Sequence, residues 1–262
     1  MKKTLVDLFE ESVRNYPNNT FLLEKTGKVF DPTTYTQVKE KGFQLGAGLQ
    51  ALGVKKGDNM ALLSEGRNMW VIGELSMFYA GAVNVPLSIK LEESNDLLFR
   101  LIHGDVKYVM VSGTQLKKVR AIIDQLPEVK KVIVFDEQAE YGEKEIAIAE
   151  VQKMGDEFLA SHTQEEFLKV ANSIQNDDYA TITYTSGTTA DPKGVVLTHR
   201  NYKVFFPLYF PYIINVFSFS LFVFYLFIPY FLSVQIQTIG RSILIACQHP
   251  YHREPHFAIH SF

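Results

Sequence analysis

At 262 residues, 47% of them hydrophobic, the chain is long enough to bury a substantial core. Its formal net charge of −3 offers no basic stripe for a phosphate backbone, which argues against a nucleic-acid partner. The single cysteine, Cys247, excludes an internal disulfide framework and favours a reducing, cytoplasmic location.

The chain begins with MKKTLVDLFEESVRNYP, which is too polar for a signal peptide. Apolar residues recur at helical spacing over Thr4–Tyr16, and Asp7 is placed to form a capping pair with the first residue of this segment. The same reasoning predicts a second helix over Thr34–Leu52, with Gln37 near its start and Gly53 as its C-terminal cap.

Strands and helices are then predicted to alternate. The predicted strands cover residues 59–64, 82–88, 107–111 and 130–135, and the predicted helices cover 69–80, 92–103 and 115–126. Residues 137–178 are charged and less periodic, so we interpret them as surface helices or an excursion before the next strand. The alternation predicts an α/β fold, a mostly parallel sheet flanked by helices, with a ligand site at the carboxyl ends of its strands.

The most informative run follows strand YATITYT (Tyr179–Thr185) and reads SGTTADPKG before a second strand, VVLT. Small residues let backbone N–H groups approach an anion, hydroxyls can donate hydrogen bonds or help to hold magnesium, and a lysine supplies a point charge. These features favour a polyphosphate site. A solvated Ser/Thr/Gly hairpin without a ligand is the alternative interpretation.

A Walker A loop is a second phosphate-binding interpretation, because Gly187 and Lys193 match part of its spacing. Two positions disagree with it. Pro192 occupies the place of the second glycine and Gly194 the place of the magnesium-binding hydroxyl. In addition, a strand rather than a helix is predicted to follow the loop.

The run YTSGTTADPKGVVLTHRNY resembles the signature loop of the adenylate-forming superfamily, which includes acyl-CoA synthetases and firefly luciferase. Residues 34–88 and 91–113 are also similar to family segments, so the likeness extends from about Leu5 to Tyr202, the N-terminal portion only. Within the superfamily the chain most resembles long-chain fatty acid CoA ligases. One departure is Ala190, where the family usually has glycine.

This resemblance implies that a carboxylic acid, here a fatty acid, reacts with ATP to give acyl-AMP, which coenzyme A then converts to a thioester. It implies Mg²⁺ as the metal, with Thr185 as a candidate ligand. It also implies phosphate binding by a set of loop residues: Thr185, Ser186, Gly187, Thr188, Thr189, Lys193 and Gly194. The superfamily's later magnesium-binding acid, ribose-binding aspartate and catalytic lysine do not appear. Because Glu254 is the only carboxylate after Lys203, we expect no acyl-AMP from this chain alone.

The composition changes abruptly near residue 203, which predicts a domain over 1–202 and an aromatic-rich apolar tail over 203–262. No charged side chain occurs between Val204 and Gly240. The tail is interpreted either as an aberrant, frame-shifted C-terminus or as a membrane segment with contact through residues 204–234. Its prolines favour the aberrant end. A membrane-tethered or non-catalytic nucleotide-binding module is the alternative function, and the sequence indicates no oligomeric state.

Overall fold

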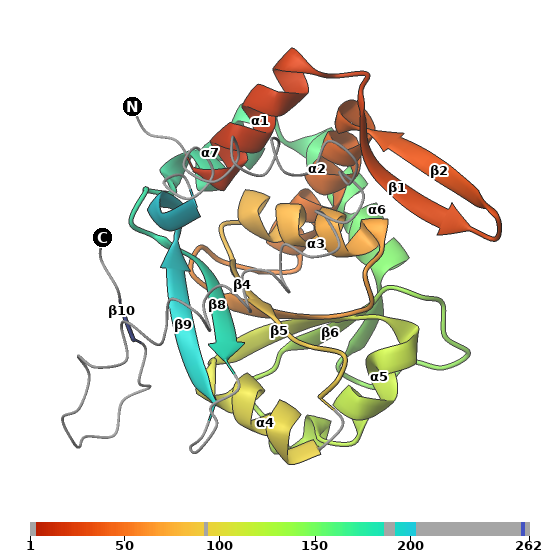
Figure 1. The fold of residues 1–262 in the computed structure, drawn as a ribbon, viewed down its shortest axis with the longest axis vertical. Coiled ribbons are helices and arrows are strands. Elements are labelled where there is room, and N and C mark those ends of the chain that lie inside the picture. The colour runs from red at the N-terminus through yellow and green to blue at the C-terminus, as the bar shows by residue number, and fades with distance from the viewer. Residues whose placement is uncertain (1–3, 92–93, 186–191, 203–257, 260–262) are drawn as a thin grey trace, which may run out of the picture.

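The computed structural model describes residues 4–91, 94–185, 192–202 and 258–259, arranged as in Figure 1. The helices are α1 (Leu5–Asn15), α2 (Tyr35–Ala51), α3 (Asn68–Tyr79), α4 (Ser94–His103), α5 (Gly113–Arg120), α6 (Ile148–Ser161) and α7 (Gln164–Ser173), with a short 3-10 helix η1 (Ile123–Gln125). The strands are β1 (Thr20–Thr26), β2 (Val29–Thr34), β3 (Asn59–Leu63), β4 (Val83–Pro86), β5 (Val106–Val111), β6 (Lys131–Val134), β7 (Glu145–Ala147), β8 (Tyr179–Thr185), β9 (Lys193–Thr198) and β10 (Ala258–Ile259).

The main sheet has eight strands in the order β10-β9-β8-β4-β3-β5-β6-β7. Strands β8, β4, β3, β5, β6 and β7 are all parallel, whereas β9 runs antiparallel to β8. The predicted α/β fold with a mostly parallel sheet is therefore confirmed. Parallel strands place their carboxyl ends at one edge of the sheet, which is where such folds position ligands.

Helices cover both faces of this sheet, and the central strands β3, β5 and β6 contribute alternate side chains to two cores. On β3, Met60 faces one core and Ala61 the other, as expected for a strand buried on both sides. The first core includes residues of α1, α2, α3, α6 and α7, and the second includes residues of α4 and α5. The result is a three-layer arrangement of helices, sheet and helices (Figure 1).

The predicted helix starts are confirmed at the level of single hydrogen bonds. Thr4 and Asp7 form a capping box at the start of α1, and Thr34 and Gln37 form one at the start of α2. In each box the two side chains accept hydrogen bonds from backbone N–H groups that the helix leaves unpaired. Gly53, the predicted cap after α2, has a φ of +96°, which glycine adopts without a steric penalty.

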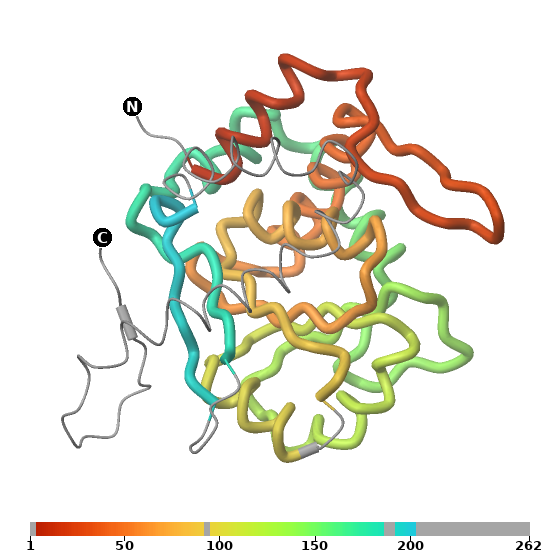
Figure 2. The backbone as a smooth tube through the Cα atoms, viewed as in Figure 1, coloured from red at the N-terminus to blue at the C-terminus, as the bar shows by residue number. Residues whose placement is uncertain are grey.

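The β1–β2 hairpin, which was not predicted, extends away from the body of the molecule (Figure 2). Within these two strands Leu22 is the only buried side chain. A hairpin with almost nothing buried on either face lacks the alternation of apolar and polar residues that identifies a strand in sequence. This is why the sequence pattern did not indicate it.

Residues 137–178 form β7, α6 and α7, so the predicted surface helices exist, and each of them buries one apolar stripe while its other residues stay exposed or partly exposed. Val151 of α6 and Phe167 of α7 are both completely buried. Helix α6 crosses α2 where Gly48 and Gly155 let the two backbones approach closely. Two short apolar stripes on otherwise charged helices are enough to complete the first core.

Candidate functional site

The predicted phosphate loop leaves the sheet at the shared carboxyl edge. β8 is parallel to β4 and ends at Thr185, next to the ends of β4 and β3 (Figure 1). A loop that starts here begins where parallel α/β sheets bind their ligands. Residues 186–191, which include the predicted Ser186, Gly187, Thr188 and Thr189, lie outside the described residues.

The base of the loop is a β-hairpin. In its register Thr185 lies opposite Lys193 and Tyr184 lies opposite Gly194. Because the chain continues into strand β9 and not into a helix, the geometry excludes the Walker A interpretation. Three of the predicted site residues, Thr185, Lys193 and Gly194, are thus brought to the two ends of one loop.

Lys193 and Gly194 occupy different environments. The side chain of Lys193 is exposed and makes no ion pair with any carboxylate in the described part of the chain. Gly194 is buried, and a Cβ atom there would lie 3.2 Å from Ile182 and 3.5 Å from the ring of Tyr184. The lysine charge is therefore available to an anion, whereas the glycine allows β9 to pack closely against β8.

Tyr184, one residue before Thr185, joins the hairpin to the C-terminal end of α4. Its hydroxyl lies 2.8 Å from Nδ1 of His103 and 3.3 Å from the carbonyl oxygen of Arg100. Burial raises the pKa of Tyr184 to about 12, so this hydroxyl keeps its proton. Sequence reasoning missed this tyrosine. His103 lies in the last turn of α4, where a basic side chain can also interact with the helix dipole.

His199 has a structural role away from Lys193. Thr198 pairs with Tyr179, so His199 lies at the end of the hairpin opposite to Lys193. There its Nδ1 accepts a hydrogen bond from the backbone N–H of Leu5 at 3.2 Å. Burial lowers the pKa of His199 to about 4, which keeps the ring neutral and able to accept this bond.

A buried polar cluster lies between α3 and the sheet. Nδ2 of Asn84 donates a hydrogen bond to Oε1 of Glu74 at 2.7 Å, and the hydroxyl of Tyr202 donates one to Thr181 at 2.8 Å. Asn84 and Thr181 are paired neighbours on β4 and β8. Burial raises the pKa of Glu74 to about 7, and Oδ1 of Asn84 has no hydrogen-bond partner in the described part of the chain. This cluster was not predicted, because its members are far apart in the sequence.

A second polar group lies at the carboxyl ends of β3, β5 and β6. Partial burial favours the neutral form of Glu65, but hydrogen bonds from Ser112 and Gln115 outweigh it and lower the pKa of Glu65 to about 2. Arg67 forms an ion pair with Asp136 at 2.8 Å. These side chains follow directly on predicted strands, a signal by which they could have been found. The bond from Gln115 to Glu65 and the ion pair of Arg67 with Asp136 join these strand ends, so we assign the group to holding this edge of the sheet together, although Oε1 of Gln115 has no hydrogen-bond partner among the described residues.

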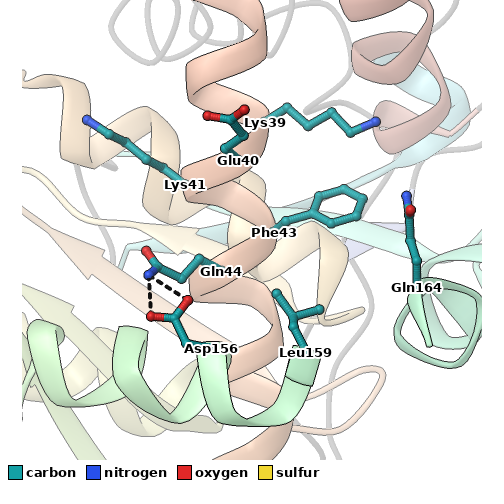
Figure 3. Close-up of a pocket in the computed structure, with 8 residues that line it drawn as sticks. All are labelled: Lys39, Glu40, Lys41, Phe43, Gln44, Asp156, Leu159 and Gln164. Carbon is teal, nitrogen blue, oxygen red and sulfur yellow. Dashed lines mark hydrogen bonds between the residues drawn. The ribbon is translucent and has the colours of Figure 1, made fainter. Parts of the chain in front are cut away.

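A groove of about 600 Å³ lies between α2, α6 and α7 (Figure 3). Phe43 and Leu159 form its apolar part, and Gln44 donates hydrogen bonds to both carboxylate oxygens of Asp156 at 2.9 Å. Its lining carries both signs of charge, and none of its lining residues comes from β8 or β9. The groove is therefore separate from the phosphate loop.

The described residues contain no group of three or more His, Cys, Asp or Glu side chains that could hold a metal ion. None of the described helices is both long and apolar enough to cross a membrane. The predicted membrane contact through residues 204–234 lies outside the described residues.

A mostly parallel α/β sheet that carries a Ser/Thr/Gly/Lys loop on the β8–β9 hairpin defines a structural class of α/β domain. The chain belongs to one family within that class: it matches the AMP-binding enzyme family over residues 9–240. The resemblance to adenylate-forming enzymes is thereby confirmed. The match also continues past residue 202 into residues outside the described part, so the predicted boundary at 202 stays a prediction.

Known relatives agree with this assignment. The chain is 28% identical over 222 residues to long chain acyl-CoA synthetase 8 of Arabidopsis thaliana, covering 76% of this chain and 30% of the relative. It is 30% identical over 224 residues to the peroxisomal acyl-CoA ligase 891 of Penicillium roqueforti, covering 76% and 31%. The chain thus spans about 30% of the length of these curated relatives. Because relatives include peroxisomal and chloroplastic proteins, membership of the family does not assign a compartment.

Solved structures agree on the fold. The anthranilate CoA ligase AuaEII, in complex with anthranoyl-AMP, superposes with a TM-score of 0.66 at 22% identity, covering 79% of this chain and 37% of that one. The long-chain-fatty-acid-CoA ligase FadD1 of Archaeoglobus fulgidus superposes with a TM-score of 0.62 at 20% identity, covering 76% and 37%. At these identities the likeness establishes the arrangement of helices and strands.

Proposed function

We propose that this chain is the nucleotide-phosphate part of an ATP-dependent acid–CoA ligase that activates a long-chain fatty acid through acyl-AMP. One observation carries the proposal: the exposed ammonium of Lys193 lies across a hairpin from Thr185, at the carboxyl edge of a parallel sheet. The names of the relatives, chiefly long-chain acyl-CoA synthetases, support a fatty acid as substrate and coenzyme A as co-substrate.

In this proposal the loop binds the β- and γ-phosphates of ATP. The donors are Lys193, the hydroxyls of Thr185, Ser186, Thr188 and Thr189, and backbone N–H groups near Gly187 and Gly194. They stabilise the negative charge that moves onto pyrophosphate as the carboxylate of the acid attacks the α-phosphate. The Thr185 hydroxyl makes no hydrogen bond to another described residue and would hold Mg²⁺, which neutralises phosphate charge when bound.

Replacing Lys193 with alanine tests the phosphate role. A charge-assisted contact of this kind contributes about 1.5–3 kcal/mol, so we expect Lys193→Ala to weaken ATP binding by at least about tenfold in the presence of Mg²⁺. Isothermal titration calorimetry measures the affinity. The matched control is Lys153→Ala, which removes an exposed lysine from α6. Equal ATP affinity in the two variants, or no ATP binding by folded wild-type protein, would contradict the proposal.

We also propose that the 262-residue polypeptide by itself binds ATP without forming acyl-AMP. Two acidic groups are needed in the parent reaction, for magnesium and for ribose, and residues 203–262 contain only Glu254. We therefore expect no pyrophosphate release above background when purified protein is incubated with ATP, Mg²⁺ and fatty acids of several chain lengths. Acyl-AMP detected by mass spectrometry would show that this proposal is wrong.

The proposal also includes a location for the chain and a domain boundary near residue 203. The single cysteine supports a reducing, cytoplasmic location for this chain. The change in composition at residue 203 supports a separate tail over 203–262.

A further inference from the structure

The β8–β9 hairpin, which carries Thr185 and Lys193, contacts helix α4 through the side chain of Tyr184. The hydroxyl of Tyr184 lies within hydrogen-bonding distance of two groups at the end of α4, Nδ1 of His103 at 2.8 Å and the carbonyl oxygen of Arg100 at 3.3 Å. That carbonyl also accepts the backbone N–H of Gly104 at 2.9 Å. The tyrosine therefore takes part in the C-terminal hydrogen bonding of α4.

The aromatic ring of Tyr184 also contacts side chains of α4. The imidazole of His103 lies edge-on to it at a centroid distance of 5.7 Å, and the guanidinium of Arg100 lies 5.8 Å from its centroid. Arg100 is itself buried and bonded back to Asp96, both to its carbonyl oxygen and to its carboxylate. On the opposite side, a Cβ on Gly194 would lie 3.5 Å from the same ring.

The Tyr184 side chain therefore links the two strands of the hairpin, because Tyr184 belongs to β8 and its ring lies next to Gly194 of β9. The next residue pair in the register is Thr185 with Lys193, the two described members of the phosphate site. A shift of the tyrosine ring would move both. Phosphate binding depends on donors held in place before the ligand arrives, so such a shift weakens binding without unfolding the protein.

We propose that Tyr184 is a positioning residue, bonded to His103, that fixes Thr185 and Lys193 for the phosphates of ATP. The proposal rests on the proposed function for its ligand, and on the geometry alone for the attachment to α4. It predicts a dependence of ATP affinity on α4, a helix that contributes no residue to the predicted phosphate loop.

Four variants of the full 262-residue chain test it by ATP titration with Mg²⁺. Tyr184→Phe keeps the ring and removes the hydroxyl, and His103→Leu removes the partner; each is expected to weaken ATP binding about five- to tenfold. The double variant is expected to bind no more weakly than either single variant, because the two residues act through one bond. His103→Asn, which can place a polar atom near the position of Nδ1, is expected to restore most of the affinity.

The matched control is Tyr79→Phe, which removes another buried tyrosine hydroxyl, bonded to Glu10 at 2.6 Å on the other side of the sheet. It is expected to lower thermal stability and leave ATP affinity unchanged. Unchanged affinity in Tyr184→Phe, or losses that add in the double variant, would overturn the proposal. So would an equal loss of affinity in Tyr79→Phe, since that would reduce the effect to general stability.

Amide hydrogen exchange separates this inference from the proposed function. In protein without ATP, Tyr184→Phe is expected to speed exchange at Gly194 and Val195, because the ring against which β9 packs is no longer held by the hydrogen bonds of its hydroxyl to α4. If wild-type protein binds no ATP but this exchange accelerates, the proposed function fails and the positioning of the hairpin stands. If exchange is unchanged, the positioning role fails whether or not ATP binds.

Discussion

Gly155→Ala is expected to destabilise the protein strongly. An ideal Cβ at Gly155 would overlap the carbonyl oxygen of Gln44 in α2, and one at Gly48 would overlap the carbonyl oxygen of Val151 in α6. These obstacles are backbone atoms, which cannot rotate away as a side chain can. The two helices would have to separate along their whole contact, so we expect a loss of at least about 3 kcal/mol in the free energy of unfolding.

Urea or thermal unfolding followed by circular dichroism measures this loss, and α2 itself supplies the control. Gly42 lies on the same helix, but a Cβ there would make an ordinary contact of 3.5 Å with the ring of Tyr79. Gly42→Ala should therefore be neutral or stabilising, by up to about 1 kcal/mol from helix propensity. If Gly155→Ala and Gly42→Ala have the same midpoint of unfolding, the close crossing of α2 and α6 is wrong.

Glu74→Gln is expected to change how stability depends on pH. Burial raises the pKa of Glu74 from its ordinary 4.5 to about 7, so the folded protein holds a proton that the unfolded chain releases. The free energy of unfolding therefore falls as pH rises from 4.5 to about 7, by roughly 3 kcal/mol in total. A glutamine carries no such proton. Its amide can also donate toward the unpartnered Oδ1 of Asn84.

We therefore expect Glu74→Gln to match the wild type in stability near pH 4.5 and to exceed it above pH 7, as measured by urea unfolding at several pH values. His199 acts in the opposite sense: its folded pKa of about 4 makes stability fall as pH drops from 6.5 to 4. Because His199 is present in both proteins, the difference between them isolates Glu74. Glu157→Gln, which changes an exposed carboxylate on α6, is the control. A difference that does not vary with pH would contradict the prediction.

The local features of this chain were readable from its sequence because each depends on residues close together in it. The capping pairs at Thr4 and Thr34 bond to side chains three residues away. The buried parallel strands appear as continuous apolar runs, and the phosphate loop appears as one uninterrupted set of small, hydroxylated and basic residues. The resemblance that the loop carries is to the family that residues 9–240 match.

Other features were decided only by the tertiary structure, because they join residues whose separation in sequence carries no pattern. The crossing of α2 and α6 depends on Gly48 and Gly155. Nothing in the sequence distinguishes these two glycines from the others, because the close approach of the two helices appears only in the folded structure. The bond between Tyr184 and His103 spans 81 positions, and each residue alone reads as an ordinary strand or helix residue.

The sequence alone predicted a candidate phosphate loop and most helices and strands of the main sheet, since periodicity and side-chain chemistry are local properties. The packed structure was needed to show what contacts Tyr184, next to Thr185, and how burial shifts the pKa values of Glu74 and His199. Side-chain contacts and pKa shifts depend on distance and burial in three dimensions, which are set when separate segments of the chain pack against one sheet.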